Sequence, residues 1–243
     1  MKFKRIAVIL IGHFRTFPHL NNHYHKFFHS MSDKVDYFLI TWDRIDFYSD
    51  KRINQPQIYF GAWLKKLIVL SDSDVDINPL DKTLKLAYLA KLGTTEKIKV
   101  EKEEGFIYDY VIETRPDLYF NSKWDFKYSE LTDNQIIMQG GKRFSTGTIT
   151  ETNQPRKWNS ELDSIDEFFS GDWYWRMNSA TYDQFSNRYD FLKSIDRDIT
   201  IDFDKQLAPY FANHPQFKIQ LAGDWNAFWP CWPADKIINI PEL

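Results

Sequence analysis

Polar side chains follow three apolar runs of this sequence, at the point where each run ends. The residues concerned are Gly12, His13 and Arg15 after the first run, Thr41 and Asp43 at the end of the second, and Arg115 and Asp117 after the third. Continuous apolar runs are typical of strands in parallel sheets, and ligands bind at the carboxyl ends of such strands. The sequence therefore predicts that these residues meet at one edge of a sheet.

The residue types in this predicted cluster suit a nucleotide diphosphate. A guanidinium group such as that of Arg15 carries a rigid fork of N–H donors that fits phosphate or carboxylate oxygens. Carboxylates supply the oxygen ligands with which Mg²⁺ or Mn²⁺ bridges a diphosphate. A structural alternative stays open, in which Arg115 and Asp117 form an ion pair at a strand end and bind nothing.

Residues 108–120 are the stretch around which the other candidates are organised. The stretch begins with aromatic and β-branched residues that favour a strand. Pro116 cannot donate a hydrogen bond to a central sheet, and it holds Arg115 in an extended or turn conformation. With a period of two residues, Glu113 falls on the same strand face as Arg115 and Asp117, which makes Glu113 a candidate additional acid.

Strands and helices alternate along the first half of the chain. Strands are predicted at residues 6–11, 35–43 and 67–70, a short helix near residues 62–66, one helix after Pro18, and another that opens at Asn78 and Pro79 and ends at Gly105. Gly93 leaves open whether the last of these is one kinked helix or two. This alternation predicts an α/β fold with a mostly parallel central sheet and helices on both faces.

The second half contains a further group of functional candidates. Asp172 and Trp173 are predicted to lie in a turn before a helix over residues 182–192, and residues 158–232 contain six of the nine tryptophans. Aromatic rings can hold the C–H faces of sugars, but their size equally suits a hydrophobic core. This irregular, aromatic-rich region therefore predicts either an acceptor-binding surface or an aromatic core.

Two other patterns resemble metal sites. Asp72 and Asp74 follow a predicted strand with the spacing Asp-x-Asp, which suits either a hard divalent cation or a solvated turn before a helix. His25 and His29 have the i, i+4 spacing of a metal-binding pair, but they lie opposite the apolar face of their helix. We expect these histidines to be solvent-exposed.

Composition and charge narrow the class of protein. The chain has 243 residues, 43% of them hydrophobic, and a net charge of −3 with acids and bases interspersed, which predicts a single domain over residues 1–243 and no nucleic-acid partner. The N-terminal apolar run of six residues is shorter than a signal peptide or a membrane span. The sequence also lacks P-loop, dinucleotide-binding, zincin, serine-hydrolase and Cys-x-x-Cys motifs. We expect a soluble, cytoplasmic protein without an integral membrane segment.

Four motifs in this order resemble a known family. They are Gly-His-Phe-Arg-Thr-Phe from Gly12, Phe-Leu-Ile-Thr-Trp-Asp from Phe38, Tyr-Asp-Tyr-Val-Ile-Glu-Thr-Arg-Pro-Asp-Leu-Tyr-Phe from Tyr108, and Gly-Asp-Trp from Gly171. Over about residues 5–212, the sequence resembles small single-domain glycosyltransferases of the GT-A type. Such enzymes are found among large DNA viruses, phages and bacterial surface-polysaccharide loci. If the source is viral, the expected location is the host cytoplasm.

The resemblance implies an activity and its ligands. A nucleotide-sugar donor would bind to the half formed by about residues 1–120, and a glycan acceptor to the half formed by about residues 121–243. The reaction would be a hexosyl-type transfer in polysaccharide biosynthesis, assisted by Mn²⁺ or Mg²⁺. Two other functions stay open: a non-catalytic glycan- or nucleotide-binding module of the same fold, and a metal-dependent phosphohydrolase.

The resemblance also implies roles for individual residues. Asp117 would be the metal ligand, while Arg115 stands where the family usually has the first Asp of Asp-x-Asp and would neutralise diphosphate charge directly. Asp172 would be the general base that deprotonates the acceptor hydroxyl. The donor would be bound by Gly12, His13, Arg15, Thr41 and Asp43, the acceptor by Trp173, and further metal ligands would come from Asp72, Asp74, Glu113, His214 or Asp224.

Overall fold

The computed structural model describes residues 5–46, 50–120, 131–143, 149–150, 156–157, 168–199, 203–222 and 228–230. Its strands are β1 (Ile6–Gly12), β2 (Val35–Trp42), β3 (Leu64–Leu70), β4 (Tyr110–Thr114), β5 (Leu118–Phe120), β6 (Gln135–Arg143), β7 (Ile149–Thr150), β8 (Arg156–Lys157), β9 (Phe168–Met177), β10 (Lys218–Ala222) and β11 (Phe228–Pro230). Its α-helices are α1 (Phe17–Met31), α2 (Lys82–Glu104), α3 (Ser179–Phe185), α4 (Arg188–Ser194) and α5 (Phe203–Asn213). Short 3-10 helices are η1 (Pro56–Tyr59), η2 (Gly61–Trp63) and η3 (Asp72–Asp74).

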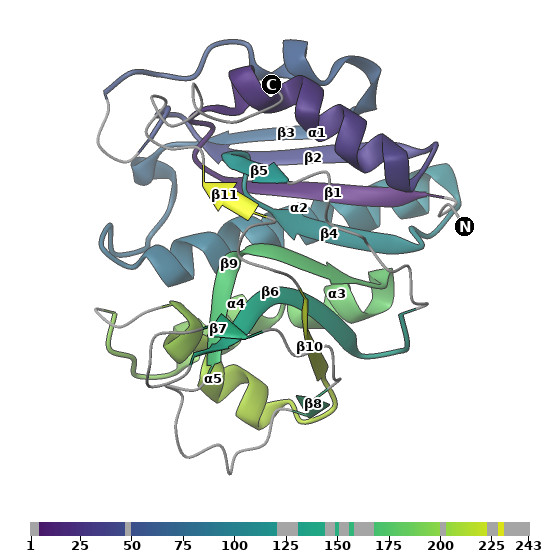
Figure 1. Cartoon of the computed structure of the whole chain (residues 1–243). Coiled ribbons are helices and arrows are strands. Elements are labelled where there is room, and N and C mark those ends of the chain that lie inside the picture. The colour runs from purple at the N-terminus through teal and green to yellow at the C-terminus, as the bar shows by residue number, and fades with distance from the viewer. Residues whose placement is uncertain are drawn as a thin grey trace.

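The central sheet has the strand order β3-β2-β1-β4-β9-β6-β10-β8 (Figure 1). The strands β3, β2, β1 and β4 are parallel neighbours, and β6 is parallel to β10. The strand β9 is antiparallel to both β4 and β6, so β6 and β10 run in the same direction as β1. The predicted α/β class with a mostly parallel sheet is confirmed.

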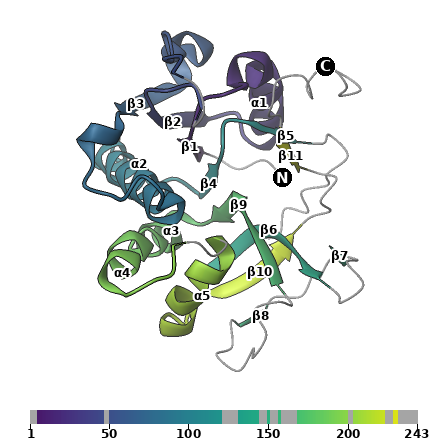
Figure 2. The same ribbon diagram turned by 90° about the vertical axis from the view of Figure 1, so that its left-hand side faces the viewer.

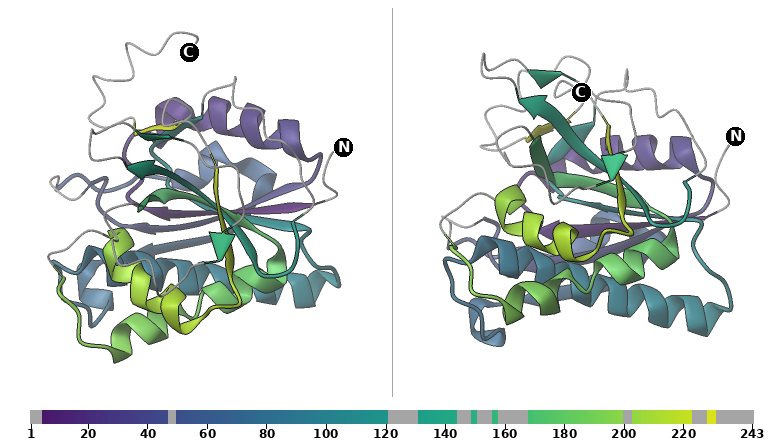
Figure 3. Two further views of the ribbon diagram at one scale, coloured as in Figure 1. Left: turned by 60° about the horizontal axis from the view of Figure 1, so that its bottom comes forward. Right: turned by 90° about the horizontal axis from the view of Figure 1, so that it is seen from below.

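Helices cover both faces of this sheet, as predicted (Figures 2 and 3). Alternate residues of β1 point to opposite faces because side chains alternate along a strand. Val8 and Leu10 pack with α1 in one buried cluster, whereas Ala7 and Ile9 pack with α2, α3, α4 and α5 in the other. The strand β1 is therefore buried on both faces, as its continuous apolar run predicts.

Gly93 lets α2 approach the sheet closely. A Cβ atom at this position would lie 2.6 Å from Cγ2 of Ile9 and 3.3 Å from Cδ1 of Ile40. The helix passes through Gly93 without a break and ends at Gly105, whose φ of 69° is in the left-handed region. Of the two alternatives left open by the sequence, the single helix is the one observed.

Several predicted element boundaries were wrong. The helix α2 begins at Lys82, because the Asp81 side chain accepts a hydrogen bond from the backbone N–H of Leu84 and caps the helix there, after Asn78 and Pro79. The predicted short helix over residues 62–66 is the 3-10 turn η2 followed at once by β3. The predicted helix over residues 182–192 is two short helices, α3 and α4.

A small second sheet brings the C-terminal part of the chain to the end of β4. The strand β11 is antiparallel to β5, and Pro230 pairs with Leu118. The backbone of residues 228–230 therefore lies beside the residues that directly follow Asp117. Separately, no helix among the described residues is both long and apolar enough to cross a membrane.

Candidate functional site

The three predicted strand ends do lie side by side. In the parallel ladders, Gly12 of β1 pairs with Thr41 of β2, and Leu10 of β1 pairs with Thr114 of β4. Because these strands run in the same direction, the loops that follow them leave the sheet at the same edge. This arrangement confirms the predicted convergence of the loops after β1, β2 and β4.

The loop after β1 has an unusual backbone. Gly12 has a φ of 110°, and Arg15 has a φ of 38°, in the left-handed region that residues with a side chain seldom adopt. The backbone N–H of Arg15 donates to the carbonyl oxygen of Ile45, 2.8 Å away, in the loop after β2. This conformation brings the Arg15 side chain towards the end of β4. Such backbone strain is common at ligand-binding sites.

Two arginines hold the Asp117 carboxylate. Arg15 Nη1 lies 2.5 Å from Oδ2 of Asp117, and Arg115 donates from Nε to Oδ1 over 2.9 Å and from Nη2 to Oδ2 over 2.8 Å. Asp117 is 1% exposed, and the two arginine side chains are 18% and 17% exposed. Burial alone would raise the pKa of Asp117, but the charges and hydrogen bonds of Arg115 and Arg15 lower it below the usual 3.8. We call these three residues the Arg–Asp–Arg cluster.

The phenol of Tyr24 fixes the turn that carries this cluster. Its hydroxyl donates to the carbonyl oxygen of Arg115 over 2.5 Å and accepts from the backbone N–H of Leu118 over 3.0 Å. Tyr24 is fully buried on α1, with its ring against Phe17 and Phe120. The residues on either side of Pro116 and Asp117 are thus tied to a helix in the core.

His13 is a neutral group beside the cluster. Its Nδ1 lies 3.3 Å from the carbonyl oxygen of Arg44. Burial lowers its pKa to about 4; the Arg15 charge acts in the same direction, against the Arg44 carbonyl, Asp46 and Asp117. At neutral pH the imidazole therefore carries no charge.

The residues at the end of β2 are held by their neighbours. Thr41 is fully buried, and its hydroxyl lies 3.3 Å from the carbonyl oxygen of Trp42. The backbone N–H of Asp43 donates to Leu70 over 2.7 Å, and its carboxylate forms an ion pair with Arg52. The contacts of Thr41 are therefore structural, whereas the half-buried Asp43 lies in the loop that meets Arg15.

The described residues do not form a ready divalent-cation site. Both oxygens of the Asp117 carboxylate already accept hydrogen bonds from guanidinium groups, whose charge repels a cation. Within the part of the chain that the structure describes, no three His, Cys, Asp or Glu side chains gather into a potential metal site. The predicted role of Asp117 as a metal ligand stays a prediction, but its surroundings do not fit it.

The other predicted metal ligands make their contacts with residues outside the Arg–Asp–Arg cluster. Glu113 is buried against α3 and α4, where it accepts from Arg188 Nη2 over 2.5 Å and from the Tyr182 hydroxyl over 2.9 Å. The expectation that Glu113 shares a face with Asp117 was wrong, because β4 ends at Thr114 and the alternation of side chains ends with it. Glu113 is instead the counter-ion of a buried arginine.

Three more acids and one histidine complete the predicted set. Asp72 pairs with Lys85 over 2.5 Å, and Asp74 accepts from the backbone N–H of Ser71 in a capping box, as in the turn alternative. His214 stacks on Tyr210 and has its Nδ1 2.7 Å from that residue's carbonyl oxygen. Asp224 lies outside the described residues.

The predicted catalytic base is on a strand. Asp172 and Trp173 lie within β9, so the turn expected there was wrong, and α3 begins only at Ser179. The antiparallel ladder between β9 and β6 pairs Trp175 with Met138 and Ser170 with Gly140, and its register shifts between these two pairs, where Asp172 lies. The positions of these two side chains lie outside the description, so their roles stay predictions.

One of the late tryptophans belongs to the core. Trp175 is 1% exposed and packs against Phe185 and Phe211. For this residue the aromatic-core alternative is the correct one. The side chains of the other five lie outside the description, and they are Trp158, Trp173, Trp225, Trp229 and Trp232.

The sequence did not predict the role of Tyr24, and it misplaced His25. Tyr24 is one of the apolar-face residues of α1, and its pattern predicts only burial; a buried tyrosine hydroxyl needs a hydrogen-bond partner, which is the signal that would have singled it out. The expected solvent exposure of His25 was also wrong. Its Nε2 lies 2.7 Å from the carbonyl oxygen of Tyr59, and its ring contacts Trp63.

Comparisons with known proteins show only a weak likeness. No protein family and no curated protein matches the sequence. The chain is similar to the galactosyltransferase LgtC, crystallised with donor and acceptor sugar analogues, at 11% identity and a TM-score of 0.39 over 90% of this chain and 73% of that one. It is also similar to the apo form of the glycosyltransferase GlyE of Streptococcus pneumoniae TIGR4, at 11% identity and a TM-score of 0.43 over 90% of this chain and 45% of that one. Likenesses at this level do not assign a function.

Proposed function

We propose that the protein is a glycosyltransferase that moves a sugar from a nucleotide-sugar donor to a carbohydrate acceptor. The observation that carries the proposal is the Arg–Asp–Arg cluster at the carboxyl edge of the parallel strands. Arg15 and Arg115 together carry two positive charges, and the buried Asp117 carries one negative charge. An anionic ligand such as a diphosphate is the natural complement of such a cluster.

The leaving group explains why these charges matter. When the bond between the sugar and the diphosphate breaks, negative charge develops on the departing phosphate oxygen. Positive groups already fixed in place stabilise that charge, because they need no reorganisation during the reaction. In this proposal Arg15 and Arg115 bind the diphosphate, and Asp117 holds the two guanidinium groups in position.

The remaining residues have proposed roles around this centre. Gly12 lets the donor approach the backbone closely. The neutral imidazole of His13 and the carboxylate of Asp43 face the nucleotide. Asp172 is the proposed base for the acceptor hydroxyl, with Trp173 as a surface for the acceptor sugar. Mn²⁺ or Mg²⁺, if bound through Asp117, would add positive charge at the diphosphate; no step proposed for the residues of this chain requires it.

A donor screen tests the proposed function. The protein is incubated with a panel of nucleotide-sugars and oligosaccharide acceptors, and release of nucleoside diphosphate is measured together with the glycosylated product. Acceptor-dependent release of nucleoside diphosphate is the expected result. If a nucleoside diphosphate binds but no sugar is transferred with any donor and acceptor, the protein is a binding module and the proposed activity is wrong.

One variant tests the proposed base within the same assay. Asp172→Asn removes the carboxylate and keeps the size of the side chain, so donor binding should be retained while transfer is lost. The matched control is Asp190→Asn, which removes an exposed carboxylate from α4 that pairs with Lys91. Unchanged turnover in Asp172→Asn would remove this residue from the base role without affecting the diphosphate site.

A further inference from the structure

We propose that Arg15 and Arg115 bind the donor diphosphate without a divalent cation, in place of the metal that the resemblance implies. This inference rests on the proposed function and specifies the chemistry of its donor site. It is based on the hydrogen bonds, burial and charge around Asp117.

The first argument is the occupation of the Asp117 oxygens. Mg²⁺ binds carboxylate oxygens at about 2.0–2.1 Å, which requires lone pairs that point to the ion. Oδ1 accepts from Arg115, and Oδ2 accepts from both Arg115 and Arg15, at distances of 2.5 to 2.9 Å. A cation coordinated here would lie directly beside two guanidinium groups, and the like charges would repel one another.

The second argument is the chemistry of the two donor side chains. Arg15 and Arg115 each place a guanidinium group at the Asp117 carboxylate. The planar fork of N–H donors in a guanidinium group matches the oxygens of a phosphate, whereas a divalent cation needs oxygen ligands.

The third argument is that the positive groups are held in place. The left-handed backbone of Arg15 is fixed by its hydrogen bond to Ile45, and the carbonyl oxygen of Arg115 is fixed by the buried hydroxyl of Tyr24. Asp117 then sets the two guanidinium groups on either side of one carboxylate. Groups that are fixed before the ligand arrives lose little conformational entropy when they bind it. In this respect the two arginines can replace a bound metal ion.

A binding experiment on the unmodified protein tests this inference. Calorimetry measures the Kd of UDP, GDP, ADP, CDP and dTDP, each in EDTA and again with Mn²⁺ in excess, together with the matching monophosphates. We expect one diphosphate to bind in EDTA with a Kd less than fivefold weaker than in Mn²⁺. We also expect it to bind at least tenfold more tightly than its monophosphate, because the second phosphate meets the arginines.

Two variants locate the effect. Arg115→Gln should remove the preference for diphosphate over monophosphate in EDTA, and Arg115→Lys should restore it in part, because lysine keeps the charge but not the fork of donors. The control is Lys99→Gln, which removes one exposed positive charge from α2 where Lys99 pairs with Glu96. This control should bind like the unmodified protein.

Each outcome of the experiment decides between the alternatives. If a diphosphate binds fivefold or more tightly with Mn²⁺ than in EDTA, the inference is overturned and a metal site at Asp117 is favoured, while the proposed transferase stands. If Arg115→Gln keeps the diphosphate preference, the arginines are not the phosphate ligands. If no nucleoside diphosphate binds under either condition, the proposed function fails as well.

Discussion

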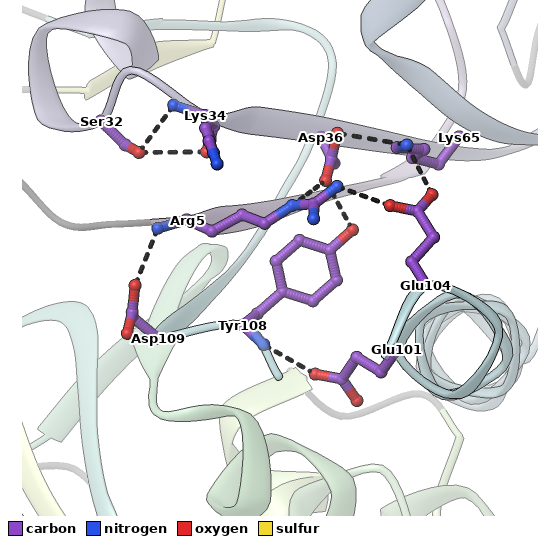
Figure 4. A network of polar contacts seen from close by, with 9 residues as sticks. All are labelled: Arg5, Ser32, Lys34, Asp36, Lys65, Glu101, Glu104, Tyr108 and Asp109. Atoms are coloured by element: carbon purple, nitrogen blue, oxygen red, sulfur yellow. Dashed lines mark hydrogen bonds and ion pairs between the residues drawn. The ribbon is translucent and has the colours of Figure 1, made fainter. Parts of the chain in front are cut away.

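Each edge of the parallel sheet has a buried aspartate, but the charged residues around the two aspartates differ. At the amino edge, Asp36 accepts from Arg5 Nε over 2.7 Å and from the Tyr108 hydroxyl over 2.8 Å (Figure 4). Glu104 completes this network through Arg5 and Lys65, at 2.9 and 2.6 Å. At the carboxyl edge, Arg15 and Arg115 both form ion pairs with Asp117.

The ratio of acids to bases differs between these two groups of residues. In Figure 4 the two bases Arg5 and Lys65 meet the acids Asp36 and Glu104, and the carboxylate of Asp109 accepts from the Arg5 backbone over 2.7 Å. The amino-edge network therefore joins two bases to three acids, whereas the Arg–Asp–Arg cluster joins two arginines to one aspartate. We infer that the amino-edge network supports the fold, and that the arginines, which lie at the edge where parallel sheets bind ligands, serve a ligand.

The largest expected effect is at the carboxyl edge. Asp117→Asn leaves two arginines without their shared counter-ion, which should lower the free energy of unfolding by about 3 kcal/mol. Urea denaturation measures this change, and transfer activity should be lost at the same time. Because the arginines are partly exposed, the variant should still fold at low urea. Full stability and full activity in Asp117→Asn would contradict the central place given to this cluster.

The next largest effect is expected from the residue that positions the cluster. Tyr24→Phe keeps the ring contacts but leaves the carbonyl oxygen of Arg115 and the N–H of Leu118 without the phenol, lowering the free energy of unfolding by about 2 kcal/mol. Measured in the transfer assay, KM for the donor should rise more than kcat falls. The control Tyr210→Phe removes a hydroxyl that donates to Gln184 and should leave KM unchanged.

A smaller effect is expected at the amino edge. Asp36→Asn weakens the hydrogen bonds from Arg5 and Tyr108, and should lower the free energy of unfolding by about 1 kcal/mol. Calorimetry should show unchanged binding of the nucleoside diphosphate. A loss of nucleotide affinity in this variant would show that the two edges are coupled and would undo the comparison.

The dependence of stability on pH separates the two edges. His13 has a pKa of about 4 when folded and 6.5 when free, so unfolding takes up a proton between these values and stability falls as pH decreases through this range. Hydrogen bonds from Lys65 and Arg5 lower the pKa of Glu104, so its contribution is lost only as pH falls below 4.5. Urea denaturation between pH 7 and pH 3 measures both.

Two substitutions assign these pH ranges. His13→Gln should reduce the loss of stability between pH 6.5 and 5, while His23, whose pKa is also about 4 because of burial, retains its share. Glu104→Gln should change only the part below pH 4.5, and by little, since its carboxylate is 38% exposed. An equal effect of both variants above pH 5 would contradict the assignment.

Local patterns were sufficient for much of the fold. Continuous apolar runs predicted β1 and β2 because a strand buried on both faces has no polar alternation. The position of Pro116 predicted the end of β4, and the parallel direction of the strands predicted that their ends would meet. These inferences work because they depend on neighbours in sequence or on a general rule of sheet topology.

The sequence by itself determined which residues reach the carboxyl edge, whereas tertiary structure decided what they do there. The ion pair of Arg15 with Asp117 joins residues 102 positions apart, and the hydrogen bond from Tyr24 to Arg115 spans 91. No periodicity encodes such partners, because the loop and helix that carry them are placed by packing. Packing on the other side of the sheet likewise pairs Glu113 with Arg188. A pattern can thus place an aspartate at a sheet edge, but only the folded chain surrounds it with two arginines.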